Sequence, residues 1–292
     1  MRVLVAAALA AMTTLGCARA AAPDKSVSQL VKELGAEIPD QRLDAAKALA
    51  KKGPEVAPAL IKALKDKDWR VRRGATDALA ALKEQAKDAV PALIEALKDK
   101  EPWVRDGAAT ALGRIGPDAE PAARPLVELL KDKDEWVRES AMTALPQVTK
   151  DKDILLQGAI NAVMVPDTGW SVRRHAMGVF GRYAKDCKPA VPALVYMLEH
   201  PGEGMWMSID RVAEILAGVG EAEKAVSLLT GLLKSDDQGT RHRAATALGK
   251  LGKDAAAALP VLKTLAAQND DERLRKAAAA AVEQIEAKKP GK

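Results

Sequence analysis

Aromatic residues are scarce in this chain: its 292 residues include one Phe, two Tyr and five Trp. Hydrophobic residues nevertheless make up 48% of the sequence, and many of them are alanine. Small apolar side chains suit closely packed helices, whereas sandwiches and barrels need β-branched and aromatic residues on their inner faces. The composition therefore excludes the all-β classes, and the hydrophobic share excludes a disordered chain.

Cysteine and long apolar runs are also in short supply. Of the two cysteines, Cys17 lies in a segment with the features of a leader, which leaves Cys187 without an intrachain disulfide partner after processing. The longest apolar run, Val3–Met12, is shorter than the roughly 20 residues that a membrane-spanning helix needs. We therefore expect a mature chain that has no transmembrane helix and is stabilised by packing.

The first twenty residues resemble a bacterial secretory signal. Met1-Arg2 is a short positive start, Val3–Met12 is apolar, and Ala18-Arg19-Ala20 offers the small residues that signal peptidase recognises. Thr14-Leu15-Gly16-Cys17 also resembles a lipoprotein signal, which makes Cys17 a possible lipidation site, although Thr14 stands where such signals usually have Leu. Both interpretations predict an exported protein, periplasmic or secreted, with a membrane-anchored lipoprotein as the second possibility.

The positive charge is modest and dispersed. Without Arg2 and Arg19, 43 basic residues face 40 acidic ones, a net charge of +3. Lys and Asp alternate in segments such as residues 65–68 and 98–100, which is typical of solvated turns. Nucleic-acid binding usually requires positive charge gathered on one face, so we expect no nucleic-acid partner.

One phrase recurs through the chain at a fixed spacing. Pro58-Ala-Leu-Ile-Lys-Ala-Leu-Lys-Asp returns as Pro91-Ala-Leu-Ile-Glu-Ala-Leu-Lys-Asp, and each copy is followed by a Trp and a Val-Arg pair. The recurrent arginine, with Ile209 in its place once, marks eight units of 30 to 36 residues: Arg42, Arg72, Arg105, Arg138, Arg173, Ile209, Arg241 and Arg275. The sequence predicts a single repeat domain over residues 26–287, followed by a basic disordered tail at 288–292.

Each unit has the apolar spacing of two amphipathic helices. Val90, Leu93, Ile94 and Leu97 follow the i, i+3, i+4, i+7 rule, and a second stripe begins at Val104. A Lys-Asp turn separates the halves, and the second half often ends at Gly, where a left-handed residue is easily placed. Because one such hairpin buries its stripe poorly, we predict an all-α superhelix of about eight stacked helix hairpins.

The Pro-Ala-Leu phrase, the Asp-rich turn and the Val-Arg-x-x-Ala-x-x-Ala-Leu phrase resemble HEAT repeats of the short bacterial type, which also occur in bilin-lyase-like proteins. The resemblance implies an α-solenoid and a ladder in which a turn acid meets an arginine of a neighbouring repeat. It assigns this structural role to arginines and to partner acids: Arg72, Arg105, Arg138, Arg173 and Arg241, with Asp68, Asp99 and Asp134. The alternative is an arginine row that binds an anionic ligand.

Candidate binding residues lie where the repeat is irregular. Pro146 falls inside a second helix and should kink or end it. Tyr196 aligns with the exposed position Glu95 and should face outward near Met205, Trp206 and Met207, because exposed aromatics with Met mark adaptable surfaces; local packing under a lengthened turn is the alternative.

Five tryptophans occupy the same turn in successive units, two or three residues before the aligned arginine position: Trp69, Trp103, Trp136, Trp170 and Trp206. Stacked repeats align them along one ridge. They either pack against the adjacent turn or form a row of partly exposed rings that holds a peptide or glycan.

The sequence contains no compact catalytic signature, such as G-x-S-x-G, a phosphate-binding loop, H-E-x-x-H or C-x-x-C. His175, Cys187 and His200 are irregularly spaced, which argues against a metal site. We therefore predict a non-catalytic scaffold of the cell envelope, without cofactor or metal, that binds a protein on a concave face lined mostly by the second helices. The alternatives are a HEAT-like lyase or enzyme accessory subunit, and glycan or peptide binding through the Trp row.

Overall fold

The computed structural model describes residues 25–166, 168–200 and 209–287, and every regular element within these ranges is a helix. The helices form eight consecutive pairs, which confirms the predicted all-α repeat fold. The first helices of the pairs are α2 (Val27–Glu33), α4 (Ala57–Ala63), α6 (Val90–Ala96), α8 (Ala123–Leu129), α10 (Lys152–Val163), α12 (Val191–Glu199), α14 (Ala222–Leu232) and α16 (Leu259–Gln268). The second helices are α3 (Pro39–Lys52), α5 (Trp69–Leu82), α7 (Pro102–Ile115), α9 (Glu135–Val148), α11 (Trp170–Arg182), α13 (Ile209–Gly218), α15 (Gln238–Leu251) and α17 (Glu272–Glu286).

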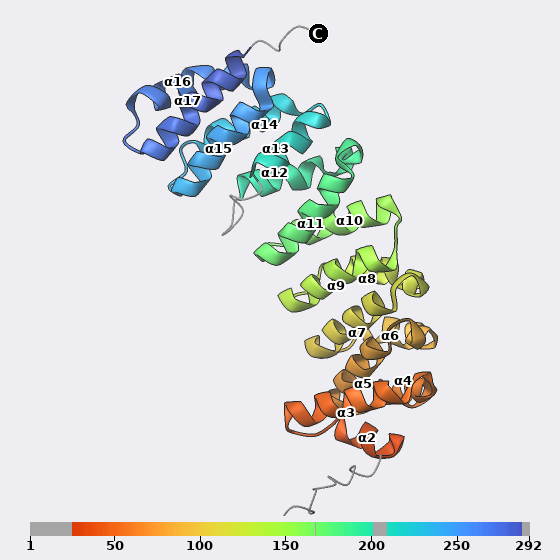
Figure 1. Ribbon diagram of the computed structural model, residues 1–292. Coiled ribbons are helices and arrows are strands. Elements are labelled where there is room, and N and C mark those ends of the chain that lie inside the picture. The colour runs from red at the N-terminus through yellow and green to blue at the C-terminus, as the bar shows by residue number, and fades with distance from the viewer. Residues whose placement is uncertain (1–24, 167, 201–208, 288–292) are drawn as a thin grey trace, which may run out of the picture.

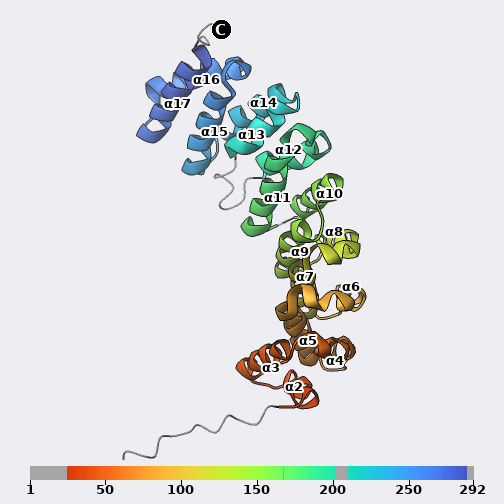
Figure 2. The same cartoon turned by 45° about the vertical axis from the view of Figure 1, so that its right-hand side comes forward.

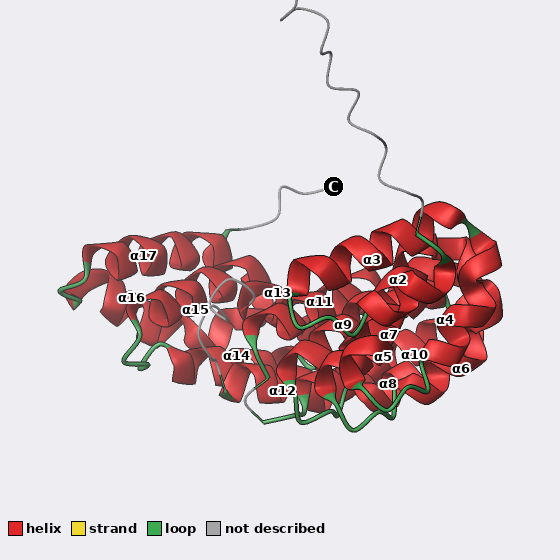
Figure 3. Ribbon diagram, turned by 90° about the horizontal axis from the view of Figure 1, so that it is seen from below, coloured by secondary structure: helices red, strands yellow, loops and turns green. Residues whose placement is uncertain are grey.

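The pairs stack into two layers. Successive second helices contact one another from α3 to α17, and the first helices form the other layer. Figures 1 and 2 show an elongated array that bends beyond α11 towards the side of the second helices. Figure 3 shows α3, α9, α11 and α13 on one side and α6, α8, α12 and α14 on the other. The second helices therefore line the inner side of the curve.

Local sequence signals set the ends of the helices. Aspartates accept hydrogen bonds from the first amides of several second helices, as Asp237 does at α15 and Asp271 at α17. Gly53 and Gly116 follow α3 and α7 with φ values of 94° and 80°, where a side chain would be strained. Short 3-10 segments, such as η2 (Lys83–Ala89) and η3 (Gly116–Ala122), then lead into the next first helix.

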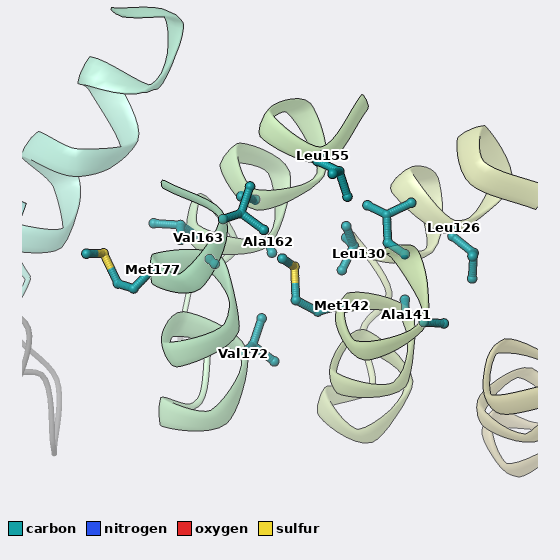
Figure 4. Close-up of a cluster of buried hydrophobic side chains, with 14 of the residues drawn as sticks. Leu126, Leu130, Ala141, Met142, Leu155, Ala162, Val163, Val172 and Met177 are labelled. Atoms are coloured by element: carbon teal, nitrogen blue, oxygen red, sulfur yellow. The ribbon is translucent and has the colours of Figure 1, made fainter. Parts of the chain in front are cut away.

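The hydrophobic core is continuous and lies between the layer of first helices and the layer of second helices. Figure 4 shows the part between α8 and α11, where Leu126 and Met142 point into the same interior as Leu155 and Val172. All four side chains are at most 1% exposed. Because each hairpin covers its apolar stripe with its neighbours, the folding free energy depends on contacts between adjacent units.

Pro146, expected from sequence to kink or end its helix, lies in the last turn of α9. α9 continues to Val148, and the amide of Thr149 donates to the carbonyl of Leu145 at 3.1 Å. The proline removes only one hydrogen bond in the last turn, which a helix packed on both sides tolerates. None of the described helices is long and apolar enough to cross a bilayer. The predicted leader, with Cys17, and the tail at 288–292 lie outside the described residues.

Candidate functional site: the second-helix face

The recurrent arginine holds the turn that precedes its own helix. In six of the eight units its Nη1 donates to the backbone carbonyl six residues earlier, over 2.5 to 2.8 Å: Arg42, Arg72, Arg105, Arg138, Arg241 and Arg275. Arg173 differs, because its Nε donates to the carbonyl of Thr168 and its Nη1 to that of His200. These hydrogen bonds hold the inter-helix turn in place, so the guanidinium group has a structural role.

Two of these arginines also form bidentate ion pairs with the next unit. Arg72 donates to Asp99 through Nε and Nη2 at 2.6 and 2.8 Å, and Arg105 donates to Asp132 in the same way at 2.7 Å for both contacts. Each of the four side chains is 8 to 12% exposed. This is the geometry of the predicted ladder, in which a guanidinium presents two parallel donors to a carboxylate.

Two of the three acids predicted for the ladder, Asp68 and Asp134, are not ladder residues. Asp68 and Asp134 are N-caps, accepting from the amides of Arg70 at 2.9 Å and Trp136 at 3.0 Å. The carboxylate that pairs with Arg105 is instead Asp132, two residues earlier in the same turn. An N-cap carboxylate must turn back towards its own helix, so it does not reach the neighbouring unit. The signal that identifies the ladder acid is an Asp six residues before the aligned arginine.

The ladder contact is longer at Arg241 than at Arg72 and Arg105. Arg241 lies 3.9 Å from Asp271, beyond hydrogen-bond distance. The Nε of Arg138 has no hydrogen-bond partner among the described residues. Asp167, which stands six residues before Arg173 and so at the ladder position, lies outside them.

The tryptophans fall into two classes. Trp103 and Trp136 are 52% and 67% exposed, whereas Trp69 and Trp170 are partly buried, with Trp69 packed against the core. Trp103 and Trp136 stand two residues before the aligned arginine, and the other two stand three residues before it. One residue is a rotation of about 100° around a helix, which is enough to turn a ring from the core to solvent.

An open groove lies beside Trp136, between α7 and α9. It has a volume of about 550 Å³ and is lined by Thr110, Gly113, Arg114, Trp136, Glu139, Ser140, Thr143, Ala144 and Gln147. A Cβ placed on Gly113 would lie 2.9 Å from the Cα of Ala144, so the two helix backbones approach closely at the floor of the groove. The groove is thus lined by one aromatic side chain and otherwise by polar and small residues.

Three acids near the groove accept hydrogen bonds from neighbouring side chains. Arg73 donates to Asp77 at 3.0 Å and also to Asp106, and Asp106 accepts from Ser140. Glu139 accepts from the hydroxyl of Ser171 in the next helix, so each second helix from α5 to α11 is joined to the next by a side-chain hydrogen bond.

The region of Tyr196 differs from its sequence-based expectation. Tyr196 is partly buried against the core, and its ring stacks on that of His200 with the centroids 4.3 Å apart. Met205, Trp206 and Met207 lie outside the described residues. The described part of this surface is therefore a packed pair of rings.

A second groove lies on the first-helix side, over α8. It has a volume of about 890 Å³, and its apolar lining includes Ile94, Val127 and Ile154 among charged residues of both signs. The link from α9 to α10 lacks the 3-10 segment that precedes α6 and α8. Its lining holds three cationic and four acidic side chains, so its charge is nearly balanced.

The side chains of Cys187, His175 and His200, which could in principle take part in catalysis, are hydrogen-bonded to backbone carbonyls. Cys187 is fully buried, its thiol donates to the carbonyl of Phe180 at 3.3 Å, and burial raises the pKa of the thiol to about 11. The Nδ1 atoms of His175 and His200 lie at 2.8 and 3.1 Å from the carbonyl oxygens of Ser171 and Tyr196. Within the described ranges no three His, Cys, Asp or Glu side chains are grouped as a metal site would need.

Comparisons with known proteins agree with this architecture. A family model described as HEAT repeats matches residues 27–87, 83–146 and 210–283, which together cover more than half of the chain. An X-ray structure of the Escherichia coli protein YibA is similar, with 22% identity, a TM-score of 0.56 and coverage of 89% of this chain and 92% of that one.

A homology model of the full-length AP-3 complex in an intermediate open conformation contains a chain with 18% identity and a TM-score of 0.61. The match covers 89% of this chain and 50% of that one, so this chain spans half of the AP-3 chain's length. At such identities the likeness concerns the fold alone. No curated protein matches the sequence.

Proposed function

The chain belongs to the HEAT-repeat family, and on that premise we propose that it is a non-catalytic scaffold that binds a protein partner on the second-helix face. Its mechanism is recognition by a preformed surface. Helices that are packed on both sides hold the contact residues in place before binding, so little conformational entropy is lost when the partner docks.

The observation that carries this proposal is a pair of exposed tryptophans, Trp103 and Trp136, of which Trp136 lines an open groove. Trp103 and Trp136 occupy the same position in adjacent units, and both are more than half exposed. A large exposed aromatic ring gains from burial against a partner, and Trp is enriched among the residues that dominate binding energy.

The environment of the reactive groups supports a role without catalysis. The carboxylates of the groove region are held by Arg73, Ser140 and Ser171, and the thiol of Cys187 is buried and protonated at neutral pH. A nucleophile or general base must instead reach a substrate with a pKa suited to the task. We further propose, from the leader-like residues 1–20, that the scaffold acts outside the cytoplasm.

Capture from envelope extracts tests the proposal. The bait is the protein from residue 21 onward, which retains every described helix, and the variant is Trp103→Ala with Trp136→Ala. Met164→Ala, which also removes an exposed apolar side chain at 44% exposure, serves as the control. We expect a stoichiometric protein to be recovered with the wild type and the control and to be lost with the double variant, at an unchanged melting temperature.

Two results would contradict this reasoning. Equal recovery of the partner by the double Trp variant would show that the two tryptophans are not part of the binding surface. Turnover by the purified protein that a single Ala substitution abolishes would overturn the non-catalytic role.

A further inference from the structure

Trp103 and Trp136 form a matched pair of exposed rings on adjacent second helices. Each is the second residue of its helix, α7 or α9, and each ring is more than half exposed. The backbone at both positions is held by hydrogen bonds. Arg73 donates to the carbonyl of Trp103 at 2.5 Å, and the amide of Trp136 donates to its N-cap aspartate at 3.0 Å. The two rings are therefore presented from fixed positions that repeat with the helices.

The row of exposed rings is two members long in the described part of the chain. The same position in the flanking units holds Arg70 on α5 and Ser171 on α11. Trp69 and Trp170 do not extend the row, because both are partly buried and the guanidinium of Arg70 lies over the ring of Trp69 at 5.5 Å. A ligand on this row meets two aromatic rings, separated by one step of the array.

The packing of α7 on α9 sets the length of that step. The two helices run side by side (Figure 1), and packed helices lie about 8–10 Å apart. They are in contact at both ends. The hydroxyl of Ser140 donates to Asp106 within about one turn of the tryptophans, and a Cβ on Gly113 would lie 2.9 Å from the Cα of Ala144. Equivalent positions on α7 and α9, including those of the two tryptophans, are therefore about 8–10 Å apart.

This step selects the conformation of a bound peptide segment. A segment that contacts both rings must present two side chains of one face about 8–10 Å apart. In a polyproline II helix, residues i and i+3 share a face and are about 9.3 Å apart. The corresponding repeats are about 6.6 and 13 Å in an extended strand and about 6 and 10.5 Å in an α-helix. Only the polyproline II repeat falls within the interval.

The charge of the neighbouring groove fits an uncharged segment. The groove that Trp136 lines contains one cationic and one acidic side chain, Arg114 and Glu139, and its other lining residues are uncharged. A proline-rich segment is neutral, and its backbone carbonyls have no internal hydrogen bonds, so they can accept from an indole N–H. It is also ordered before binding, which keeps the entropy cost of docking low.

We propose that the protein partner docks through a proline-rich segment in the polyproline II conformation, which crosses α7 and α9 with prolines three residues apart on Trp103 and Trp136. The inference rests on the proposed scaffold function and names the class of segment that its exposed tryptophans bind. Aromatic side chains are the usual platform for such segments, because the flat proline ring packs against an aromatic face.

Peptides that differ only in proline spacing test the proposal. One fluorescein-labelled ten-residue peptide carries Pro-Ala-Ala-Pro between Gly and Ala residues, and matched peptides of the same composition place the prolines two or four residues apart. Fluorescence anisotropy with the protein from residue 21 onward should show the three-residue spacing binding at least about fivefold more tightly than either matched peptide. Its affinity should change little as salt is raised, because no ion pair contributes.

Single-ring variants locate the contact. Trp103→Ala and Trp136→Ala should each weaken the three-residue-spacing peptide about fivefold or more and remove the preference for its spacing, whereas Trp136→Phe, which keeps a ring, should retain most of the binding. Ile38→Ala is the matched control, because it removes a side chain that is 53% exposed at the N-terminal end of the array, and it should change neither affinity nor preference. Thermal unfolding verifies that each variant remains folded.

Four results would overturn the inference: no binding of the three-residue-spacing peptide, equal or tighter binding of a matched peptide, a steep loss of affinity with salt, or tighter binding of a neutral N-acetylglucosamine hexasaccharide. The scaffold proposal fails separately. If the double Trp variant loses the captured partner but no proline peptide binds the wild type, the scaffold stands and the proline-rich segment is wrong. If the peptide binds but the double Trp variant still captures the partner, the scaffold proposal is wrong about its binding surface.

Discussion

The ion pair between Arg105 and Asp132 offers a direct measurement of what the ladder contributes to stability. Both contacts are 2.7 Å long, and the two side chains are 9% and 10% exposed. Asp132→Asn keeps the shape of the side chain but removes its charge and replaces one acceptor with an amide donor. Arg105 is then left as a nearly buried cation with half of its partner.

Removing one member of a buried ion pair typically costs about 3–5 kcal/mol, and the oxygen that Asn retains reduces this to about 2–3 kcal/mol. For a domain of this size each kcal/mol lowers the melting temperature by about 2–4 °C. Asp132→Asn should therefore lower it by about 4–12 °C in a scan followed by circular dichroism. Because the pair lies between units in the N-terminal half, the unfolding transition should also broaden.

Glu128→Gln is the matched control. Glu128 pairs with Lys131 in the same unit at 3.0 Å, but these side chains are 70% and 53% exposed, and exposed pairs contribute at most about 1 kcal/mol. A melting temperature for Asp132→Asn as close to the wild type as that of Glu128→Gln would refute the argument that the ladder holds adjacent units together.

Three further predictions concern packing, reactivity and pH. Gly113→Ala places a Cβ 2.9 Å from the Cα of Ala144 and should destabilise the protein by about 1–3 kcal/mol, whereas Gly178→Ala, whose Cβ would have no atom within 4 Å, should be neutral or stabilise the protein by up to about 1 kcal/mol. Urea unfolding measures both free energies, and equal effects would contradict the close approach of the two helices. In protein lacking residues 1–20, Cys187 should resist a thiol reagent until urea unfolds the chain, so rapid native labelling would show that the thiol is not buried. Burial raises the pKa of Asp99, but hydrogen bonds from its ladder arginine and from a backbone amide outweigh burial, so the pKa is lowered. The carboxylate of Asp99 therefore contributes fully to stability above its unfolded pKa of about 4, and this contribution is lost as the pH falls through the folded pKa. The urea midpoints of the wild type and of Asp99→Asn should converge in acid, and a constant difference down to about pH 2 would contradict this.

The repeat architecture could be predicted from sequence because its determinants are local. The spacing of apolar residues specifies each helix, the glycines and aspartates specify its ends, and the regular return of one phrase requires equivalent units to stack. The recurrent arginine was also predictable as a structural residue, because it meets the same turn carbonyls in almost every unit.

The site was less predictable, because it depends on side-chain direction. Asp132 and Asp134 are the same residue type in one turn, yet the first pairs with the previous unit and the second caps its own helix. The six-residue spacing of Asp132 from Arg138 separates the two in sequence, but only the backbone of the turn shows that this spacing belongs to the acid that pairs with the previous unit. Tyr196, expected to face outward, lies partly buried beside His200.

The sequence by itself therefore determined the number of helix pairs, their order and the residues that form the core, since these follow from periodicity along one chain. Only the tertiary structure decided which tryptophans face solvent, which acid completes each ion pair and where a groove opens between α7 and α9. The physical reason is that a shift of one residue turns a side chain by about 100° around a helix, and the packing of two adjacent units determines what that side chain then meets.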